Sequence, residues 1–340
     1  MKKHVNIPIF IPHLGCPNQC VFCNQHTISG VKNFEPESVI CDIESALKTI
    51  KDGTESEIAF FGGSFTGIDR ELMIELLKIA YSYVSDGRVS SIRCSTRPDY
   101  INEQVLDHLK KYGVKIIELG LQTVDEDVLK LTKRGHSFED EKKACQLIVE
   151  RGFTLIGQMM IGLPGATFES ELKTADFIIS SGASGVRIYP TVVFRDTELS
   201  FMTEKKKYIP LTEDEAIKRT ASVMKKFIDA GLDVIRVGLC SSENLASEET
   251  YFAGPNHPAI GELVENEIYY NIIYEKLKSY NLSPDLRITV FVPRGSLSKA
   301  IGQKKKNRLR LKNDFSLSDI KFCEDEKLSD YEISLKIGEM

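Results

Sequence analysis

The sequence lacks any long hydrophobic run, low-complexity linker or large total number of cysteines. No apolar stretch of the 340-residue chain approaches the ~20 residues needed to cross a bilayer. The first residues are basic and then apolar, but Pro8, Pro12 and His13 interrupt them and no small-residue cleavage site follows. We therefore expect a first strand rather than a signal peptide, and a cytoplasmic protein. Eight cysteines are too few for a disulfide scaffold of this length.

Strand-like and helix-like patterns alternate along the chain. Strands are expected at residues 6–11, 58–61, 89–94, 114–121, 154–161 and 185–190, and a further strand at 233–238. Helical patterns, with apolar residues three and four apart, lie near 36–51, 69–84, 101–112, 137–151, 167–181 and 213–230. This alternation predicts an α/β fold of parallel strands with right-handed crossovers, either an open sheet or a complete or partial barrel.

The composition changes near residues 240–260, where polar residues, Gly and Pro accumulate. We place a domain boundary there, with a first domain over 1–240 and a C-terminal extension over 241–340. Within the extension, residues 287–312 carry nine Lys and Arg and no acid, whereas residues 314–340 carry eight acids and three lysines. A basic stripe beside an acidic tail indicates either a phosphate-binding surface or a solvated, internally balanced face.

Three cysteines stand close together in HLGCPNQCVFCNQHTISG: Cys16, Cys20 and Cys23. Thiolates are soft ligands that suit iron–sulfur centres or zinc. Three of them can hold a [4Fe–4S] cubane whose fourth iron stays open, or His26 can complete a Cys3His zinc site. For the five scattered cysteines, a buried free thiol is the expected state (Cys41, Cys94, Cys145, Cys240 and Cys323).

The Cys-x3-Cys-x2-Cys spacing after a first strand, with Phe22 before the third cysteine, resembles the radical S-adenosylmethionine (SAM) superfamily. The resemblance implies a partial (β/α)6 TIM-type barrel, a [4Fe–4S] cluster and SAM as cofactors, and reductive cleavage of SAM to a 5′-deoxyadenosyl radical. It also implies a flavodoxin or ferredoxin as reductant. Gly62 and Gly63 stand where the family has its Gly-Gly motif, which would let the backbone approach the SAM ammonium. Ser64 follows where the family often has Glu.

Further segments resemble the branch that holds the Elongator catalytic subunit and the oxygen-independent coproporphyrinogen oxidases: RCSTRPDYI, ELGLQTVDEDVLKLTKRGH, GQMMIGLPGAT and VRIYPTVVFRDTEL. The first three imply SAM contacts by Ser95, Gln122, Arg134, Gln158 and Met160, with Arg134 paired to the SAM carboxylate. The fourth implies that two substrate-facing catalytic residues lie at the barrel mouth, Arg187 and Tyr189. Cys240 is expected to be a buried hydrophobe rather than a catalytic thiol.

The motifs described so far do not identify the substrate. The segment after residue 240 is too short for the acetyltransferase domain of the Elongator subunit, so acetyl transfer is not expected. VFVPRGSLSKAIGQKKKNRLRLK faintly resembles an RNA-binding KH element, although the second glycine of its Gly-x-x-Gly loop is absent. One hypothesis is modification of tRNA or rRNA, with RNA bound by basic residues (Lys304, Lys305, Lys306, Arg308 and Arg310). The alternatives are a small metabolite or porphyrin-like carboxylate anchored by Arg187, and a zinc-containing RNA-binding module without radical chemistry.

Overall fold

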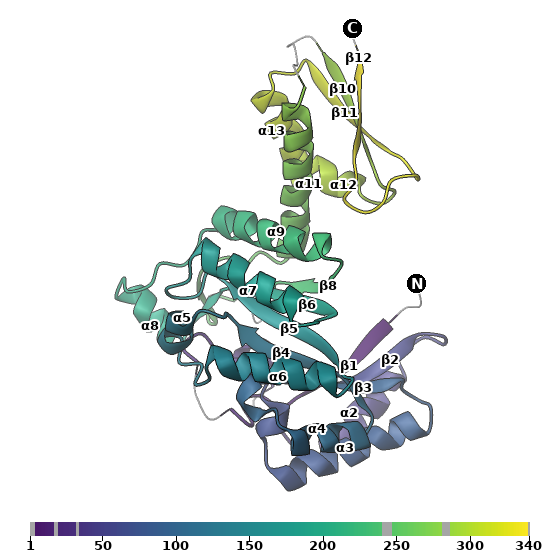
Figure 1. Cartoon of the computed structure of the whole chain (residues 1–340), viewed down its shortest axis with the longest axis vertical. Coiled ribbons are helices and arrows are strands. Elements are labelled where there is room, and N and C mark those ends of the chain that lie inside the picture. The colour runs from purple at the N-terminus through teal and green to yellow at the C-terminus, as the bar shows by residue number, and fades with distance from the viewer. Residues whose placement is uncertain (1–3, 17–19, 32–33, 240–246, 281–285, 339–340) are drawn as a thin grey trace. The chain divides into compact units, whose positions relative to one another are not determined.

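Seven parallel strands form one sheet, in the order β1-β2-β3-β4-β5-β6-β8 (Figure 1). The computed structural model describes residues 4–16, 20–31, 34–239, 247–280 and 286–338. The strands are β1 (His4–Phe10), β2 (Glu55–Phe61), β3 (Ser91–Thr96), β4 (Val114–Gln122), β5 (Thr154–Ile161), β6 (Gly185–Pro190) and β8 (Asp233–Val237). The predicted α/β partial barrel is confirmed, and so is the further strand after the sixth.

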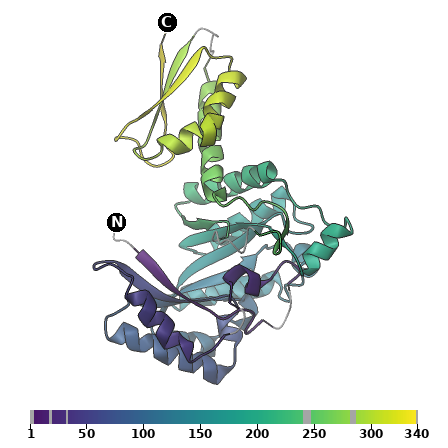
Figure 2. The ribbon, with the colours of Figure 1, turned by 180° about the vertical axis from the view of Figure 1, so that it is seen from behind.

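Helices connect successive strands and begin where the sequence supplies caps. They are α2 (Ser38–Leu47), α3 (Arg70–Ser85), α4 (Glu103–Lys111), α5 (Glu126–Leu131), α6 (Phe138–Glu150) and α7 (Phe168–Ser180). Asp69 accepts hydrogen bonds from the first-turn amides of α3, and Ser137 forms a capping box with Asp140 at α6. Figure 1 shows α3, α4, α6 and α7 on one face of the sheet, and Figure 2 shows the face that they leave uncovered.

The two faces of the sheet differ in chemistry because side chains alternate along each strand. The helix-covered face is apolar: a Cβ added to Gly157 of β5 would meet Ile178 of α7 at 2.9 Å. The opposite face, called the inner face below, carries charged and polar side chains at the intervening positions (Glu57, Arg93, Glu118, Gln158 and Arg187). Each of these strands except the edge strands is buried on both sides, so the polar residues of the inner face must find partners there.

Shorter elements lie near the carboxyl ends of the strands. They are α1 (Gln25–Ser29), the 3-10 turns η1 (Phe65–Gly67) and η2 (Pro98–Tyr100), β7 (Val193–Phe194), α8 (Glu198–Glu204) and β9 (Tyr251–Ala253). Strands β7 and β9 pair antiparallel. Val21 packs with Val193 and Leu199 in a small apolar cluster, which ties the cysteine-bearing loop to this region.

A second compact unit contains residues 213–225 and 257–340, whereas the sheet unit contains residues 1–212 and 226–256. Helix α9 (Glu213–Asp229) contributes to both. The second unit also holds α11 (Ile260–Lys278), α12 (Leu297–Ile301), η3 (Gln303–Lys305) and α13 (Lys306–Asp314), with the sheet β11-β10-β12. Its strands are β10 (Arg287–Val292), β11 (Asp319–Glu324) and β12 (Ser334–Gly338), and β10 is parallel to β11 but antiparallel to β12.

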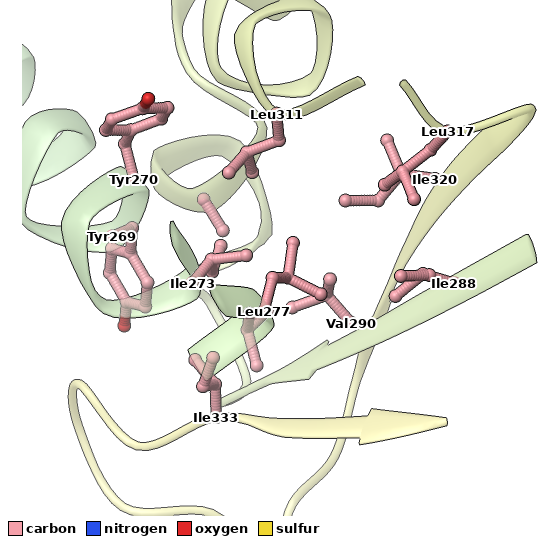
Figure 3. Packing of buried hydrophobic residues seen from close by; sticks show 12 residues of the cluster. Tyr269, Tyr270, Ile273, Leu277, Ile288, Val290, Leu311, Leu317, Ile320 and Ile333 are labelled. Carbon is pink, nitrogen blue, oxygen red and sulfur yellow. The ribbon is translucent and has the colours of Figure 1, made fainter. Parts of the chain in front are cut away.

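An apolar core of its own stabilises the second unit. Ile273 and Leu277 of α11 point toward Val290 of β10, with Leu311 of α13 nearby (Figure 3). This α+β arrangement is the expected C-terminal extension. The predicted domain division at residue 240 stays a prediction, since residues 240–246 lie outside the described part of the chain.

Two predictions about scattered cysteines are wrong. Cys94 and Cys145 are buried free thiols as expected, but Cys41 and Cys323 are exposed. Cys41 lies between the buried Val39 and Ile43 of α2, so its apolar neighbours point to the core while Cys41 itself points away. Cys240 lies outside the described residues. No helix within the described chain is long and apolar enough to span a membrane.

Candidate functional site

The loop after β1 carries the three clustered cysteines and is tied to the end of β2. The His13 amide donates to Gly62 O at 3.0 Å, and the Ser64 amide donates to Leu14 O at 3.0 Å. A Cβ on Gly63 would lie 2.4 Å from Leu14 O, and a Cβ on Gly15 would lie 2.2 Å from Ser64 O. Both positions therefore need glycine because the two loops touch backbone to backbone.

This packing adds a second reason for the Gly-Gly motif. The motif predicts that the two glycines contact SAM, and that contact stays a prediction. In the structure, Gly63 first allows the cysteine loop to lie against the end of β2. A larger residue at this position would push away the loop that carries the cysteines.

Each of the three thiols has a polar neighbour, and two of these neighbours come from segments distant in the chain. Cys16 Sγ lies 3.5 Å from Ser64 Oγ, and Gln25 Nε2 lies 3.7 Å from Cys23 Sγ. Arg134 Nη1 lies 3.3 Å from Cys20 Sγ. Burial, together with the neighbouring Cys20 and Cys16, raises the pKa of Cys23 to about 12. Cys20 and Cys16 thus lie close enough to Cys23 to act on its charge, and the Arg134 guanidinium favours the thiolate of Cys20.

Arg134 is buried beside this group and is held from two sides. Its Nη2 donates to Gly120 O of β4, and its Nη1 reaches Cys20. Gln122 ends β4 in the left-handed region (φ 73°), and its Nε2 would lie 3.1 Å from a Cβ on Gly120. Two buried atoms here have no hydrogen-bond partner among the described residues, Arg134 Nε and Gln122 Oε1.

A second layer of charged residues supports the Arg134 backbone. Arg97 donates to Asp99 at 2.9 and 3.0 Å and also to Arg134 O. His136 Nε2 lies 3.0 Å from Glu141 Oε1, and both side chains are fully buried. Burial, with the nearby charges of Arg134 and Arg97, lowers the pKa of His136 to about 3. Neutral His136 thus remains next to the two arginines across the ordinary pH range.

On the inner face, one buried carboxylate joins three strands. Glu118 of β4 accepts from Arg187 Nε at 2.7 Å and Nη2 at 3.0 Å, and from Arg93 Nη1 at 3.0 Å. Gln158 Nε2 donates to Glu118 at 2.9 Å and lies 3.3 Å from Ser95 Oγ. The network therefore brings together three predicted site residues, Ser95, Gln158 and Arg187, around a carboxylate that no sequence motif indicated.

Arg93 extends this network to β2 and β1. It donates to Glu57, which also accepts from Ser91 and lies 2.9 Å from His4 Nε2. Charged residues at the centres of apolar strands, with opposite signs on neighbouring strands, are the sequence signal that could have identified Arg93, Glu57 and Glu118. Such residues are rarely buried unless they are paired.

Arg187 is not available as an unpaired cation. Glu118 takes two of its donors, and its guanidinium lies 5.6 Å from the centre of the Phe61 ring. Burial opposes the charged form, but Glu118 and Tyr189 outweigh it and raise the pKa of Arg187. Tyr189 is partly exposed and stands beside Met160 in the register of β5 and β6. The anion-anchor role predicted for Arg187 therefore lacks a free guanidinium.

Most of the basic stripe in the second unit is ion-paired. Lys306 lies 3.2 Å from Asp214, Arg308 2.9 Å from Asp319, and Arg310 2.6 Å from Glu267. Arg294 and Lys299 also have carboxylate partners. By contrast, Lys304 and Lys305 are exposed and have no ion-pair partner among the described residues. Both take left-handed backbone angles (φ 51° and 63°) between α12 and α13.

The donor set fits an iron–sulfur cluster better than one metal ion. His26, the fourth ligand of the alternative zinc site, uses Nδ1 to contact Val31 O at 3.1 Å. Three thiols spread over one loop suit the separate corners of a cubane. The orphaned Arg134 Nε and Gln122 Oε1 next to them suit a polar ligand such as SAM.

Comparisons with known proteins agree with this geometry. Residues 10–178 match the family model described as Radical SAM superfamily, and residues 183–270 match that of the Radical_SAM C-terminal domain. An uncharacterised protein of Methanocaldococcus jannaschii is 31% identical over 235 residues, which cover 64% of this chain and 70% of that protein.

A tRNA uridine(34) acetyltransferase of Methanocaldococcus infernus is 30% identical over 220 residues. The match covers 58% of this chain but only 41% of that protein, so the chain spans less than half of this relative. Among solved structures, Elp3 of Methanocaldococcus infernus with an N-terminal deletion matches with a TM-score of 0.61 at 23% identity. That match covers 81% of this chain and 64% of the other, and it supports the fold.

Proposed function

This chain belongs to the radical SAM superfamily. We propose that it modifies RNA, and specifically tRNA, by radical chemistry. It is an enzyme of a family whose cofactors are a [4Fe–4S] cluster and SAM. The chemistry these cofactors supply when bound is reductive cleavage of SAM to a 5′-deoxyadenosyl radical, with a flavodoxin or ferredoxin proposed as the electron donor.

The cysteine loop packed on the end of β2 is the observation on which the catalytic proposal depends. Cys16, Cys20 and Cys23 would hold the cluster, and Arg134, beside Cys20, would balance its charge and bind the SAM carboxylate. Gln122 would present its orphaned Oε1 to the same ligand. On the inner face, Ser95 and Gln158, fixed around Glu118, would contact SAM, and Arg187 would orient the substrate.

Two observations support RNA as the substrate. The curated relative above acts, by its name, on uridine 34 of tRNA, and it shares 220 aligned residues with this chain. In the second unit, β10, α12, α13 and β11 form a strand–helix–helix–strand element with parallel strands, and Gly302 to Lys305 lie between its helices. KH domains clamp four nucleotides of RNA backbone with a loop at this place.

Of the five basic residues predicted to bind RNA, only two have no carboxylate partner within the described residues. Lys306, Arg308 and Arg310 already have carboxylate partners, whereas exposed Lys304 and Lys305 do not within the described residues. We therefore assign the contact to these two lysines. The small-carboxylate alternative needed a free Arg187, which Glu118 occupies.

The decisive experiment is mass spectrometry of nucleosides from tRNA and rRNA of cells with and without the gene. We expect one modified nucleoside to be missing from tRNA of the deleted strain. The intact gene should restore it, and a Cys20→Ala variant, which removes one proposed cluster ligand, should not. Identical nucleoside profiles in both strains would refute the RNA proposal.

A binding assay tests the lysine assignment. Bulk tRNA is titrated into the anaerobically reconstituted holoenzyme at several salt concentrations. Because each lost phosphate contact reduces the slope of log affinity against log salt by about 0.7–0.9, a Lys304→Ala/Lys305→Ala variant should lose roughly twice that. Lys142→Ala/Lys143→Ala, a pair of exposed lysines on α6, is the matched control and should keep the wild-type slope.

A further inference from the structure

The inner face of the sheet is balanced in charge over β2 to β6. Arg93 is held by Glu57 and Glu118, and Arg187 is held by two bonds to Glu118. Two buried cations thus meet two buried carboxylates. A substrate lying along β2 to β6 would contact hydrogen-bonding groups and the Phe61 ring, but no unpaired cation of these strands. This surface therefore suits a neutral planar group, and it has no free positive charge to bind a polycarboxylate.

One arginine of the inner face lies outside this network. Arg236 of β8 is paired in register with Arg187 of β6, directly after a β-bulge. The side chain of Ile235, the residue before it, lies 3.3 Å from a Cβ built on Gly185. Gly185 is two positions before Arg187 on β6 and so shares its face of the sheet, which places the bulge on the inner face. Arg236 is exposed, and no described residue forms an ion pair or hydrogen bond with its guanidinium.

The position of Arg236 relates it to the SAM-binding region. In register, Arg236 aligns with Arg187, Arg187 with Gln158, and Gln158 with Gly120, the residue whose carbonyl Arg134 contacts. Three strand spacings of about 4.8 Å separate Gly120 from Arg236, or roughly 14 Å along the sheet. A free guanidinium therefore stands at the level of the reaction site, at the edge of the sheet.

We propose that Arg236 binds a backbone phosphate of the RNA strand while a base lies along the charge-balanced inner face. This inference rests on the proposed function and deepens it, because it specifies the substrate as a nucleotide within a chain rather than a free small carboxylate. The planar guanidinium offers paired donors that match phosphate oxygens. The target base would be taken out of its stack to reach the sheet, as in other enzymes that act on bases.

The test compares Arg236→Gln, Arg236→Lys and wild-type holoenzyme in titrations with bulk tRNA over a range of salt concentrations. Loss of one charge-assisted phosphate contact should weaken binding about 10- to 100-fold and reduce the salt slope by about 0.7–0.9. Arg236→Lys should keep the slope but bind more weakly, since it retains the charge without the paired donors. Arg151→Gln, at the end of α6 where Asp107 lies 2.7 Å from the guanidinium, is the control and should match wild type.

Iron and sulfide content and SAM affinity are measured for every variant and should not change, which separates lost substrate binding from lost cofactor. Wild-type affinity and slope in Arg236→Gln would overturn the role of Arg236 while leaving the proposed function intact. Absence of tRNA binding by the wild type at low salt would instead contradict the proposed function. If wild type binds coproporphyrin III and Arg236→Gln loses only that binding, Arg236 serves a carboxylate and the phosphate assignment is wrong.

Discussion

Glu118 allows a quantitative test of the inner-face network. Its side chain is fully buried and accepts hydrogen bonds from Arg187, Arg93 and Gln158. Glu118→Gln keeps the volume but leaves Arg187 as a buried cation without a counter-charge. Breaking a buried pair from one side costs about 3–5 kcal/mol of unfolding free energy. For a domain of about 150–250 residues, that corresponds to a fall in Tm of roughly 6–20 °C.

The control is a solvent-exposed ion pair with the same geometry. Glu44 accepts two bonds of 2.7 Å from Arg88, the same bidentate geometry, but both side chains are exposed. Glu44→Gln should leave Tm almost unchanged, because exposed pairs are screened by solvent. The Tm of both variants and of the wild type is measured by anaerobic thermal unfolding, with circular dichroism as the signal.

A double variant identifies the cause of the loss. Glu118→Gln/Arg187→Met also removes the unpaired cation. Its Tm should therefore lie above that of Glu118→Gln, because burying an apolar side chain costs less free energy than burying a lone charge. If Glu118→Gln and Glu44→Gln lower Tm equally, or if the double variant is the least stable of all, the network does not stabilise the sheet in the way described.

Three other variants test separate parts of the structure. Gly63→Ala should lower iron content after reconstitution, because its Cβ would lie 2.4 Å from Leu14 O and displace the cysteine loop; wild-type iron content would contradict this packing. Arg134→Ala should weaken SAM binding by about tenfold or more, measured by equilibrium dialysis, and unchanged affinity would remove Arg134 from the SAM site. Tyr270→Phe should reduce the loss of stability above pH 10 in urea unfolding. Burial, with the Asp314 hydrogen bond, raises the pKa of folded Tyr270 to about 12, so its contribution is complete below pH 10 and is lost as pH rises toward 12; an unchanged profile would count against it.

Much of the site could be predicted because its elements are local in sequence. The cysteine spacing, the glycines after β2 and the polar ends of the strands lie in short segments, and parallel strands bring their carboxyl ends to one edge. The strands and helices followed from apolar periodicity, with β8 as the least regular of them. Each of these features depends on residues that are close together in the sequence, so a pattern along the chain is enough to predict it.

The partners of charged side chains could not be predicted in the same way. The small-carboxylate alternative needed Arg187 as a free anion anchor, but Glu118, 69 residues away in the chain, is paired with it. The stripe over residues 287–312 looked like one continuous basic surface, yet carboxylates from α9, α11 and β11 neutralise much of it. Cys41 was expected to be buried, but the helix turns it outward.

The sequence by itself determined the fold class, the family and the three candidate cluster ligands, because each is encoded in contiguous segments whose spacing is set by strand and loop geometry. Only the tertiary structure decided which charges remain free, since pairing in space depends on strand order and register. That is why Arg187 and Arg236, 49 positions apart but adjacent across β6 and β8, have opposite roles: the first is neutralised inside the sheet, and the second is exposed at its edge.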